Sequence, residues 1–369
     1  MQRRTANRRG LILFLGLAVA CQAAPARPTD VATAWPTTIP APTQTPRPLP
    51  TAFRIPPQLP ASFESRHLNS LDAAHTYVAD TCTYLRNRWD PAKAAPGTIV
   101  MLVMLHSINQ GKPEGSDAMN EVLFARMMDD LHEQRFQAIS VEQLAGFLER
   151  NARIPSRSVV LMQDGRRYPE NFERHFRRYW DTWGWPVVNA WDNQGSTTEP
   201  LWEDYVALAK DGLVDFQVYG PTFDPSAKPR TDEYLADQLQ KPIDALQERM
   251  GKAPIGVVWP NGFSPQSVRI ARQLGYRLGF TFNARGPVMY NWIPLSESTD
   301  SFRPSYQPEA AVGDPLMTLP RFWPYQVHNA LDGVRISGRE AAAIAEQNKG
   351  IELEYYDIVC ADKYGPIPR

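Results

Sequence analysis

A short apolar strand that ends on Gln163 and Asp164 is the part of this sequence whose residue types most directly suggest chemistry. The stretch 158–163 reads SVVLMQ, and Asp164 and Gly165 follow before a helical pattern begins. A strand that ends on polar residues at a tight turn is a usual way of presenting catalytic groups. An aspartate there can bind a metal or accept a proton, whereas the neighbouring amide cannot ionise. The pattern is typical of a working site, an altered site or an ordinary strand end.

The elements that must position these residues alternate between strand and helix. Apolar runs at 98–108 and 157–163 predict strands buried on both faces, and further strand patterns follow at 185–191, 213–220, 254–262 and 277–283. Helical spacing of apolar residues predicts helices at 120–135, 140–151, 168–183, 200–212, 231–251 and 264–275. This order indicates a parallel sheet, either doubly wound or closed into a barrel. No GxGxxG or GxxxxGK stretch follows a strand, which argues against a nucleotide cofactor.

Function in a parallel barrel is expected at the carboxyl ends of the strands. Polar and aromatic residues gather at these predicted ends, and any site should be assembled from them. They are His106, Gln163, Asp164, Trp191, Asp192, Asn193, Tyr219, Trp259 and Asn261.

The ordered set of segments from Gly97 to Arg321 resembles the polysaccharide deacetylase family, also called the NodB-homology domain. The resemblance is carried by VMLHSI, ISVEQLAGFLERNARIPSRSVVL, LMQDG, LWEDYVALAKDGLVDFQVYG, VVWPNGFSPQSVRIARQLGYRLGFTF and a late LPR that ends at Arg321. It implies a distorted (β/α)7 barrel that removes N-acetyl groups from glycans. The family's chemistry uses a divalent metal, commonly zinc, held by one aspartate and two histidines, with a second aspartate as the base.

Carried over to this chain, the family's site is altered. The base falls on Gln163, the ligand aspartate on Asp164, and the two histidines on Tyr219 and Phe223. An amide cannot accept the proton, a phenol with a pKa of about 10 is a poor zinc ligand, and a phenyl ring has no lone pair. The resemblance therefore implies a barrel without a metal cofactor and without the family's deacetylase activity. A relocated metal site of Asp164, Asp224 and His106 is the alternative.

Three functional interpretations stay open. In the first, the barrel binds a glycan or cell-wall polysaccharide, although aromatic residues at strand ends also cap cores. The candidate binding residues are His106, Trp191, Tyr219, Phe223, Trp259, Asn261 and Arg321. In the second, the chain is an active carbohydrate hydrolase. It is either an N-deacetylase, in which Gln163 positions a water and Asp164 acts as the base, or a glycosidase, in which Asp164 works with Asp192 or Asp224. In the third, it is a structural surface protein.

The N-terminus reads as an export signal. Four arginines precede an apolar run at 11–20, which is too short for a stable membrane span. Cys21 follows LAVA and resembles the lipidated cysteine of bacterial lipoproteins, while cleavage near Ala24 without lipidation is the alternative. We therefore expect an exported protein at the bacterial cell surface or in the periplasm, attached to the membrane by a lipid on Cys21.

Composition divides the rest of the chain. We expect a signal peptide at 1–21, a Pro/Thr-rich linker at 22–60, a helical N-terminal extension at 61–96, the barrel at 97–325 and a C-terminal extension at 326–369. Cys82 and Cys360 are a candidate disulfide of an exported protein, although their spacing does not show whether they approach each other. The net charge of −1 argues against nucleic acid as a partner.

Overall fold

The computed structural model describes residues 54–112, 118–165, 167–193, 197–223 and 230–368. The expected signal peptide, Cys21, the linker up to residue 53 and Asp224 lie outside these residues. Residues 54–60 are described and form no regular element.

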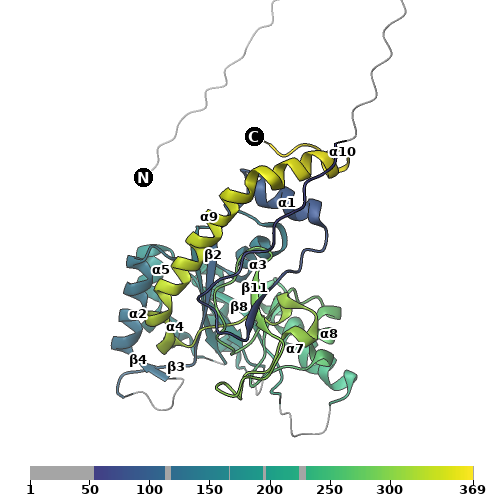
Figure 1. Ribbon diagram of the computed structural model, residues 1–369. Coiled ribbons are helices and arrows are strands. Elements are labelled where there is room, and N and C mark those ends of the chain that lie inside the picture. The colour runs from purple at the N-terminus through teal and green to yellow at the C-terminus, as the bar shows by residue number, and fades with distance from the viewer. Residues whose placement is uncertain (1–53, 113–117, 166, 194–196, 224–229, 369) are drawn as a thin grey trace, which may run out of the picture. The chain divides into compact units, whose positions relative to one another are not determined.

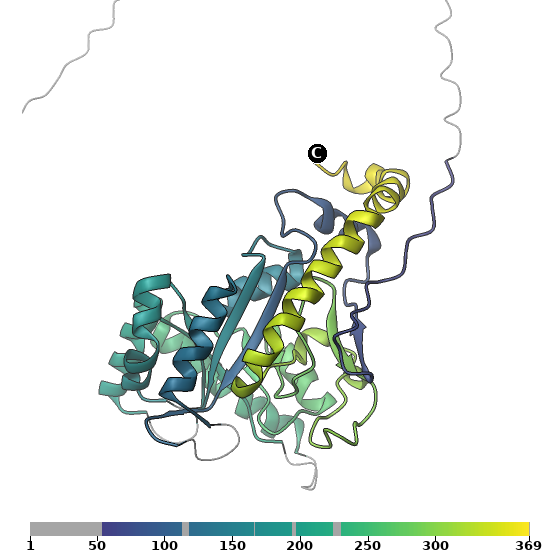
Figure 2. The ribbon, with the colours of Figure 1, turned by 60° about the vertical axis from the view of Figure 1, so that its left-hand side comes forward.

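A curled parallel sheet forms the centre of the molecule (Figures 1 and 2). Its strands run in the order β10-β9-β8-β7-β6-β2, and β5 pairs with β6 outside this order. Their bounds are β2 Ile99–Leu105, β5 Gln137–Ala138, β6 Arg157–Asp164, β7 Val187–Trp191, β8 Val214–Tyr219, β9 Gly256–Val258 and β10 Leu278–Phe280. Every neighbouring pair is parallel, as the alternation of strand and helix patterns predicts.

The irregular segment Leu319–Phe322 closes this sheet into a barrel. On one side, the Leu319 amide donates to the Gly279 carbonyl at 2.8 Å. On the other side, the Phe322 amide donates to the Leu102 carbonyl at 2.7 Å, and the Met104 amide donates to the Phe322 carbonyl at 3.0 Å. Together with the six strands of the main order, this segment acts as a seventh strand-like element between β10 and β2, and we call it the closing stave. The expected distorted (β/α)7 barrel is confirmed.

Helices connect the strands. They are α2 Glu121–Glu133, α3 Val141–Arg150, α4 Pro169–His175, α5 Arg177–Trp183, α6 Glu199–Asp211, α7 Asp232–Met250 and α8 Pro265–Gln273. Helix α3 packs against the cluster that fills the barrel interior through Val141, Leu144 and Leu148, and the other helices cover the outside of the barrel. The helix expected at 168–183 is two helices, because the chain leaves the helix at Phe176. The start of α3 follows from its sequence, since Ser140 and Gln143 form a reciprocal capping box.

Strand alternation divides the core into two layers. One face of the sheet packs against the outer helices, and Val159, Leu161 and Val218 belong to this outer cluster. The other face fills the barrel interior, to which Val160 and Met162 belong. Because successive side chains of a strand point to opposite faces, each strand-end residue is assigned to one layer by its position.

The N-terminal extension is only partly helical. Residues 70–89 read as helical in the sequence, but only α1 Thr81–Trp89 is a helix. Before it, β1 Asp72–His75 pairs antiparallel with β11 Ile293–Ser296, a partner more than 200 positions away in the chain. A local pattern does not reveal such a partner, so the strand was missed. A second small pair joins β3 Ser107–Asn109 to β4 Ala118–Asn120, and short 3-10 turns are η1 Ala310–Val312, η2 Pro315–Met317 and η3 Pro324–Gln326.

One long helix forms most of the C-terminal extension. The helix α9 Val327–Val359 contacts η3 and β2 near its start and α1 farther along, and α10 Ala361–Tyr364 follows it (Figure 1). Gly97 and Gly338 let α9 approach the chain before β2, because an added Cβ on Gly338 would lie 2.9 Å from the Gly97 carbonyl oxygen. Cys82 in α1 and Cys360 at the end of α9 form a disulfide, with their Cα atoms 5.4 Å apart. Within the described residues, no helix is long and apolar enough to cross a membrane.

Candidate functional site

A buried ion pair between Asp164 and Arg321 lies inside the barrel mouth, by which we mean the carboxyl ends of the barrel strands. Arg321 Nη1 donates to Asp164 Oδ1 at 2.5 Å, and Nη2 donates to Oδ2 at 2.9 Å. The side chains are only 1% and 3% exposed. Arg321 Nε donates to the Thr281 carbonyl at 2.8 Å, which fixes the plane of the guanidinium. Both carboxylate oxygens are therefore held by a rigid, planar cation.

Arg321 lies at this position because it belongs to the closing stave. Its neighbours Leu319 and Phe322 are hydrogen-bonded to β10 and β2, which fixes the backbone on both sides of the residue. Asp164 is the last residue of β6 and lies in the interior layer with Val160 and Met162. Asp164 and Arg321 meet because the end of β6 and the closing stave face the same barrel interior.

His106 lies beside the ion pair. Its Nε2 is 3.8 Å from Asp164 Oδ2, which is too long for a hydrogen bond. Its ring stacks on Trp323, with centroids 5.9 Å apart and planes 10° apart. His106 therefore stands at the end of β2, and its buried Nδ1 is bonded by none of the described residues.

Gln163 does not face Asp164. It is fully buried, and its Nε2 donates to the carbonyls of Leu105 at 2.8 Å and His106 at 2.7 Å. These bonds tie the end of β6 to the end of β2. Val159, Leu161 and Gln163 are every second residue of β6, so their side chains share one face. The side chain of Gln163 therefore lies on the outer face of the sheet. The amide at the position where the resemblance places the base is thus bonded to two backbone carbonyls and faces away from Asp164.

Tyr219 and Phe223 lie where the resemblance places two histidine ligands. Burial, and secondly the charge of Asp164, raises the pKa of the half-buried Tyr219 to about 12, so its phenol stays protonated at neutral pH. Phe223 is half-buried and is held by a bond from its amide to the Pro260 carbonyl at 3.2 Å. Neither side chain is a donor that zinc prefers.

The donor set does not fit the metal that the resemblance implies. Asp164 is paired with Arg321, and no group of three His, Cys, Asp or Glu side chains in the described part of the chain could hold a metal ion. The alternative site of Asp164, Asp224 and His106 involves Asp224, which lies outside that part.

Trp191 and Trp259 belong to the core. Each is 1% exposed. Trp191 packs on Trp202 with ring centroids 5.1 Å apart, and Trp259 Nε1 donates to the Met317 carbonyl at 2.8 Å. Neither ring offers a face on which a sugar could stack, so the predicted binding role does not fit these two residues. Asn261 is exposed and adopts a left-handed backbone conformation.

Sequence reasoning missed an aromatic group at the mouth, which we call the mouth platform: Phe282, Trp323 and Tyr325. The ring of Trp323 lies 6.2 Å from Tyr325 and 6.4 Å from Phe282, measured between centroids. Tyr325 is 58% exposed. The signal was present, because FWPY directly follows the LPR that ends at Arg321. Trp323 and Tyr325 were overlooked because they follow the closing stave and not one of the regular strands, whereas Phe282 lies two residues after β10.

The comparisons match this chain to solved structures only. No protein-family model matches it, and no curated protein matches it. The Streptococcus pyogenes deacetylase PplD, solved in complex with acetate, is 18% identical with a TM-score of 0.49, covering 64% of this chain and 98% of that chain. IcaB from Ammonifex degensii is 17% identical with a TM-score of 0.48, covering 64% and 97%. A polysaccharide deacetylase from Bacillus cereus is 14% identical with a TM-score of 0.45, covering 63% and 69%. At these identities the likeness concerns the fold.

Proposed function

We propose that this chain is a polysaccharide deacetylase-like protein that binds a glycan at the barrel mouth and lacks metal-dependent deacetylase activity. The observation that carries the proposal is the buried bidentate pair of Arg321 and Asp164. Asp164 is the one residue with a metal-binding side chain at the positions where the family has its ligands, and this pair engages both of its oxygens.

Displacing Arg321 to bind a metal would be costly. A dication at Asp164 would lie within a few ångströms of the guanidinium and repel it. Moving Arg321 away would leave a buried cation without its partner, and breaking a buried pair costs about 3–5 kcal/mol. Tyr219 and Phe223 supply no compensating ligand. Metal binding at Asp164 is therefore opposed by its pairing with Arg321 and by the lack of further ligands.

The described residues at the mouth also lack the groups that amide hydrolysis requires. The family's base position is Gln163, whose Nε2 is bonded to two backbone carbonyls. Without a base to take the proton from water, and without a cation to stabilise the oxyanion, the two largest contributions to catalysis are missing. The glycosidase alternative needs a second free carboxylate beside Asp164, but both oxygens of Asp164 are bonded to Arg321.

Glycan binding is supported by the mouth platform. The half-buried Trp323 and the exposed Tyr325 present aromatic surface beside the partly exposed ring of His106. Aromatic faces contact the apolar face of a sugar ring, and nearby polar groups bond its hydroxyls. Export with a lipid on Cys21 is part of the proposal, and the disulfide of Cys82 and Cys360 supports an oxidising compartment.

Metal content and acetate release test the loss of activity. We expect the purified full chain to carry no stoichiometric zinc and to release no acetate from chitooligosaccharides. A variant with Tyr219→His and Phe223→His should bind zinc weakly, and adding Arg321→Gln should raise the affinity about tenfold or more, because Asp164 is released. The control Arg249→Gln, on a surface pair with Glu199, should add nothing. Chelator-sensitive acetate release by the unmodified chain would contradict the proposal.

Binding to a glycan array tests the mouth platform. Trp323→Ala and Tyr325→Ala should each weaken binding of the recognised glycan, because stacking area is lost. Tyr234→Ala removes an exposed tyrosine on α7 and serves as the matched control. If the unmodified chain binds no glycan on the array, or if the control weakens binding as much as Trp323→Ala, the binding function must be given up.

A further inference from the structure

Four arginines gather at the amino-terminal end of the barrel strands, opposite the mouth. They come from three parts of the chain: Arg135 follows α2, Arg157 is the first residue of β6, and Arg335 and Arg339 lie one turn apart on α9. We call these four residues the arginine cluster. The proposed function uses none of them.

The first two members meet where α2 ends. Arg157 Nη1 donates to the Gln134 carbonyl at 2.8 Å, one residue before Arg135. Arg135 is exposed and has a φ of 63°, the left-handed conformation in which helices most often end on glycine. A glycine would fit this backbone with less strain. The chain nevertheless holds a second guanidinium here, beside that of Arg157.

The other two members reach the same place on α9. Ile99 is the strand partner of Arg157. An added Cβ on Gly338 would lie 2.9 Å from Ile99 Cγ2, so α9 packs directly on the start of β2. Gly338 lies between Arg335 and Arg339, and α9 also contacts α2. Figure 2 shows the long helix α9 running beside β2. Both α9 arginines are therefore carried past the end of the strands where Arg157 begins β6.

Carboxylates compensate little of this positive charge. Arg335 Nη2 donates to Asp332 Oδ1 at 2.5 Å, and Asp332 is 75% exposed. The other three arginines form no ion pair with a carboxylate of the described residues. The buried Arg335 Nε is likewise bonded by no described residue. Burial first, and then the charges of the other three members, lower the pKa of the Arg157 guanidinium below its ordinary value. Four like charges therefore face one carboxylate, an arrangement that repels itself without an anion.

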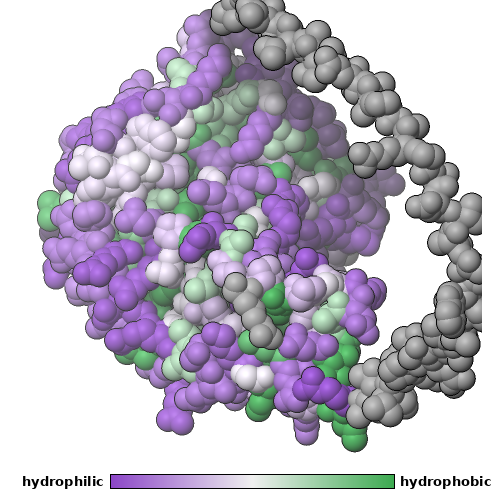
Figure 3. Space-filling model, turned by 90° about the horizontal axis from the view of Figure 1, so that it is seen from above, coloured by the Kyte–Doolittle hydropathy of each residue, from purple (hydrophilic) through white to green (hydrophobic). Residues whose placement is uncertain are grey.

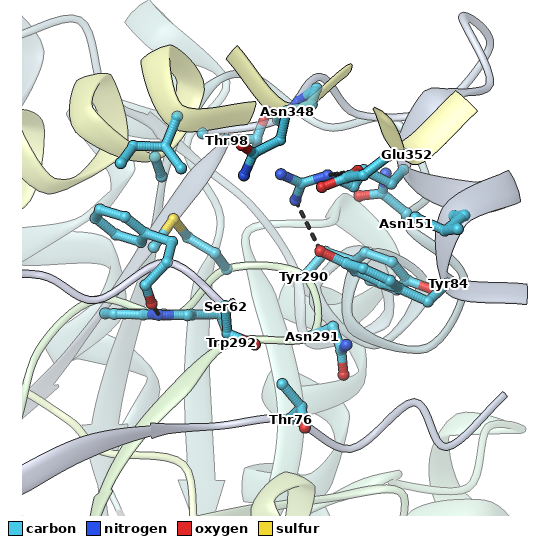
Figure 4. A pocket seen from close by; sticks show the side chains of 18 of the residues that line it. Ser62, Thr76, Tyr84, Thr98, Asn151, Tyr290, Asn291, Trp292, Asn348 and Glu352 are labelled. Atoms are coloured by element: carbon cyan, nitrogen blue, oxygen red, sulfur yellow. Dashed lines mark hydrogen bonds and ion pairs between the residues drawn. The ribbon is translucent and has the colours of Figure 1, made fainter. Parts of the chain in front are cut away.

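The cavity at the amino-terminal end of β2 offers a contrast. Figure 4 shows this cavity, with Tyr84 and Glu352 on its wall. Its one lining arginine, among the described residues, is Arg88, whose Nε lies 2.9 Å from Glu352 Oε2 and whose Nη1 donates to Tyr84 Oη at 2.9 Å. An anion would meet no unpaired cation there, whereas three of the four guanidiniums of the arginine cluster lack a carboxylate.

We propose that the arginine cluster binds a phosphate group. A phosphate group carries negative charge and several acceptor oxygens, and planar guanidiniums bind such oxygens in pairs. The α9 arginines approach the group from one side, and Arg135 and Arg157 approach it from the other. The group belongs either to inorganic phosphate or to the headgroup of an anionic phospholipid, since both present the same oxygens. The proposal does not depend on the mouth platform, because the two sites share no residue.

Calorimetric titration of the full chain with inorganic phosphate tests the ligand class. Sodium chloride holds the ionic strength constant during the titration, so that general screening does not change. We expect saturable binding, and we expect it to weaken when the titration is repeated at higher ionic strength.

Matched variants locate the binding. Arg135→Gln and Arg339→Gln each remove one exposed member and should weaken phosphate binding about three- to tenfold, and the double variant should weaken it further. Arg269→Gln removes an exposed arginine that is paired with Asp232 on the opposite side of the barrel order, and it should leave the affinity unchanged. Phosphate binding that is equal in the double variant and in the unmodified chain would place the anion elsewhere.

Vesicles distinguish the two sources of the phosphate group. A chain with Cys21→Ser, which cannot carry a lipid, is sedimented with phosphatidylcholine vesicles that contain or lack phosphatidylglycerol. If the headgroup is the source, Arg135→Gln with Arg339→Gln should reduce binding to the phosphatidylglycerol vesicles, and the rest of the chain is the same in both samples. If inorganic phosphate is the source, the double variant should lose phosphate affinity and sediment as before. A double variant that changes neither measurement overturns the proposal.

Discussion

At the scale of single residues, strand alternation decides which neighbours can share a site. Gln163 and Asp164 are consecutive in β6, so one points to the outer layer and the other to the barrel interior. Tyr219 in β8 lies on the interior side with Asp164, whereas Trp191 and Trp259 lie on the outer side. The sequence contained the alternation but not which face is the interior, because both faces of β6 are apolar.

The pKa of Tyr219 gives a pH-dependent prediction. Burial and the charge of Asp164 raise this pKa to about 12, above its ordinary value of 10.0. The unfolded chain therefore loses the phenol proton at a lower pH than the folded chain does. The stability that this residue contributes is complete below pH 10 and is lost as the pH rises to about 12.

Tyr219→Phe removes this titration, so its free energy of unfolding should fall less steeply than that of the unmodified chain over that pH interval. Urea denaturation at several pH values measures the difference, and phenolate absorbance follows the titration itself. Tyr234→Phe, at an exposed position, should behave like the unmodified chain. Equal slopes for Tyr219→Phe and the unmodified chain would show that Tyr219 is not buried beside Asp164.

At the scale of elements, the sequence predicted what local periodicity encodes. The six strands of the main order and the helices between them follow from apolar spacing and caps. It did not predict β1, whose partner β11 lies far away in the chain, or the closing stave Leu319–Phe322, which has no strand pattern of its own. Arg321 was singled out from its motif, but its pairing with Asp164 was not, since 157 positions separate them and only the closed barrel brings them together.

Gly279 in β10 lets the closing stave approach, which gives a prediction at this scale. A Cβ added there would lie 2.1 Å from the Met317 carbonyl oxygen and 2.6 Å from Trp259 Nε1. Gly279→Ala must therefore push the chain before the stave away from β10. We expect a loss of about 1–3 kcal/mol in the free energy of unfolding, the usual effect of overpacking.

Chemical denaturation measures this loss. Gly111→Ala is the matched control, because nothing lies within 4 Å of the added Cβ and its effect should be small. If both substitutions change the free energy of unfolding equally, the close contact between β10 and the stave is not as described.

At the scale of the whole molecule, α9 runs from the mouth to the opposite end of the described chain. Its first turn lies beside η3 and the mouth platform, whereas its last turns lie beside α1 and the segment at Arg54, which bonds Glu354 (Figure 1). A helix of 33 residues is about 50 Å long at 1.5 Å per residue. The mouth and Arg54 therefore lie toward opposite ends of α9. Figure 3 views the end that carries α10, where hydrophilic residues predominate and hydrophobic ones form small separate groups.

The disulfide fixes this far end and gives the last prediction. Cys82 and Cys360 are separated by 278 positions, so their bond joins α1 to the end of α9 across most of the chain. Removing such a bond typically costs about 2–5 kcal/mol, because the unfolded chain gains freedom. Cys82→Ser, Cys360→Ser and the double variant should lose similar amounts of stability in urea, and a reductant should bring the unmodified chain to the same value. Glycan binding at the mouth should be unchanged, since that site lies at the other end of α9. A reductant that leaves the unfolding midpoint where it was would show that the two cysteines are not paired.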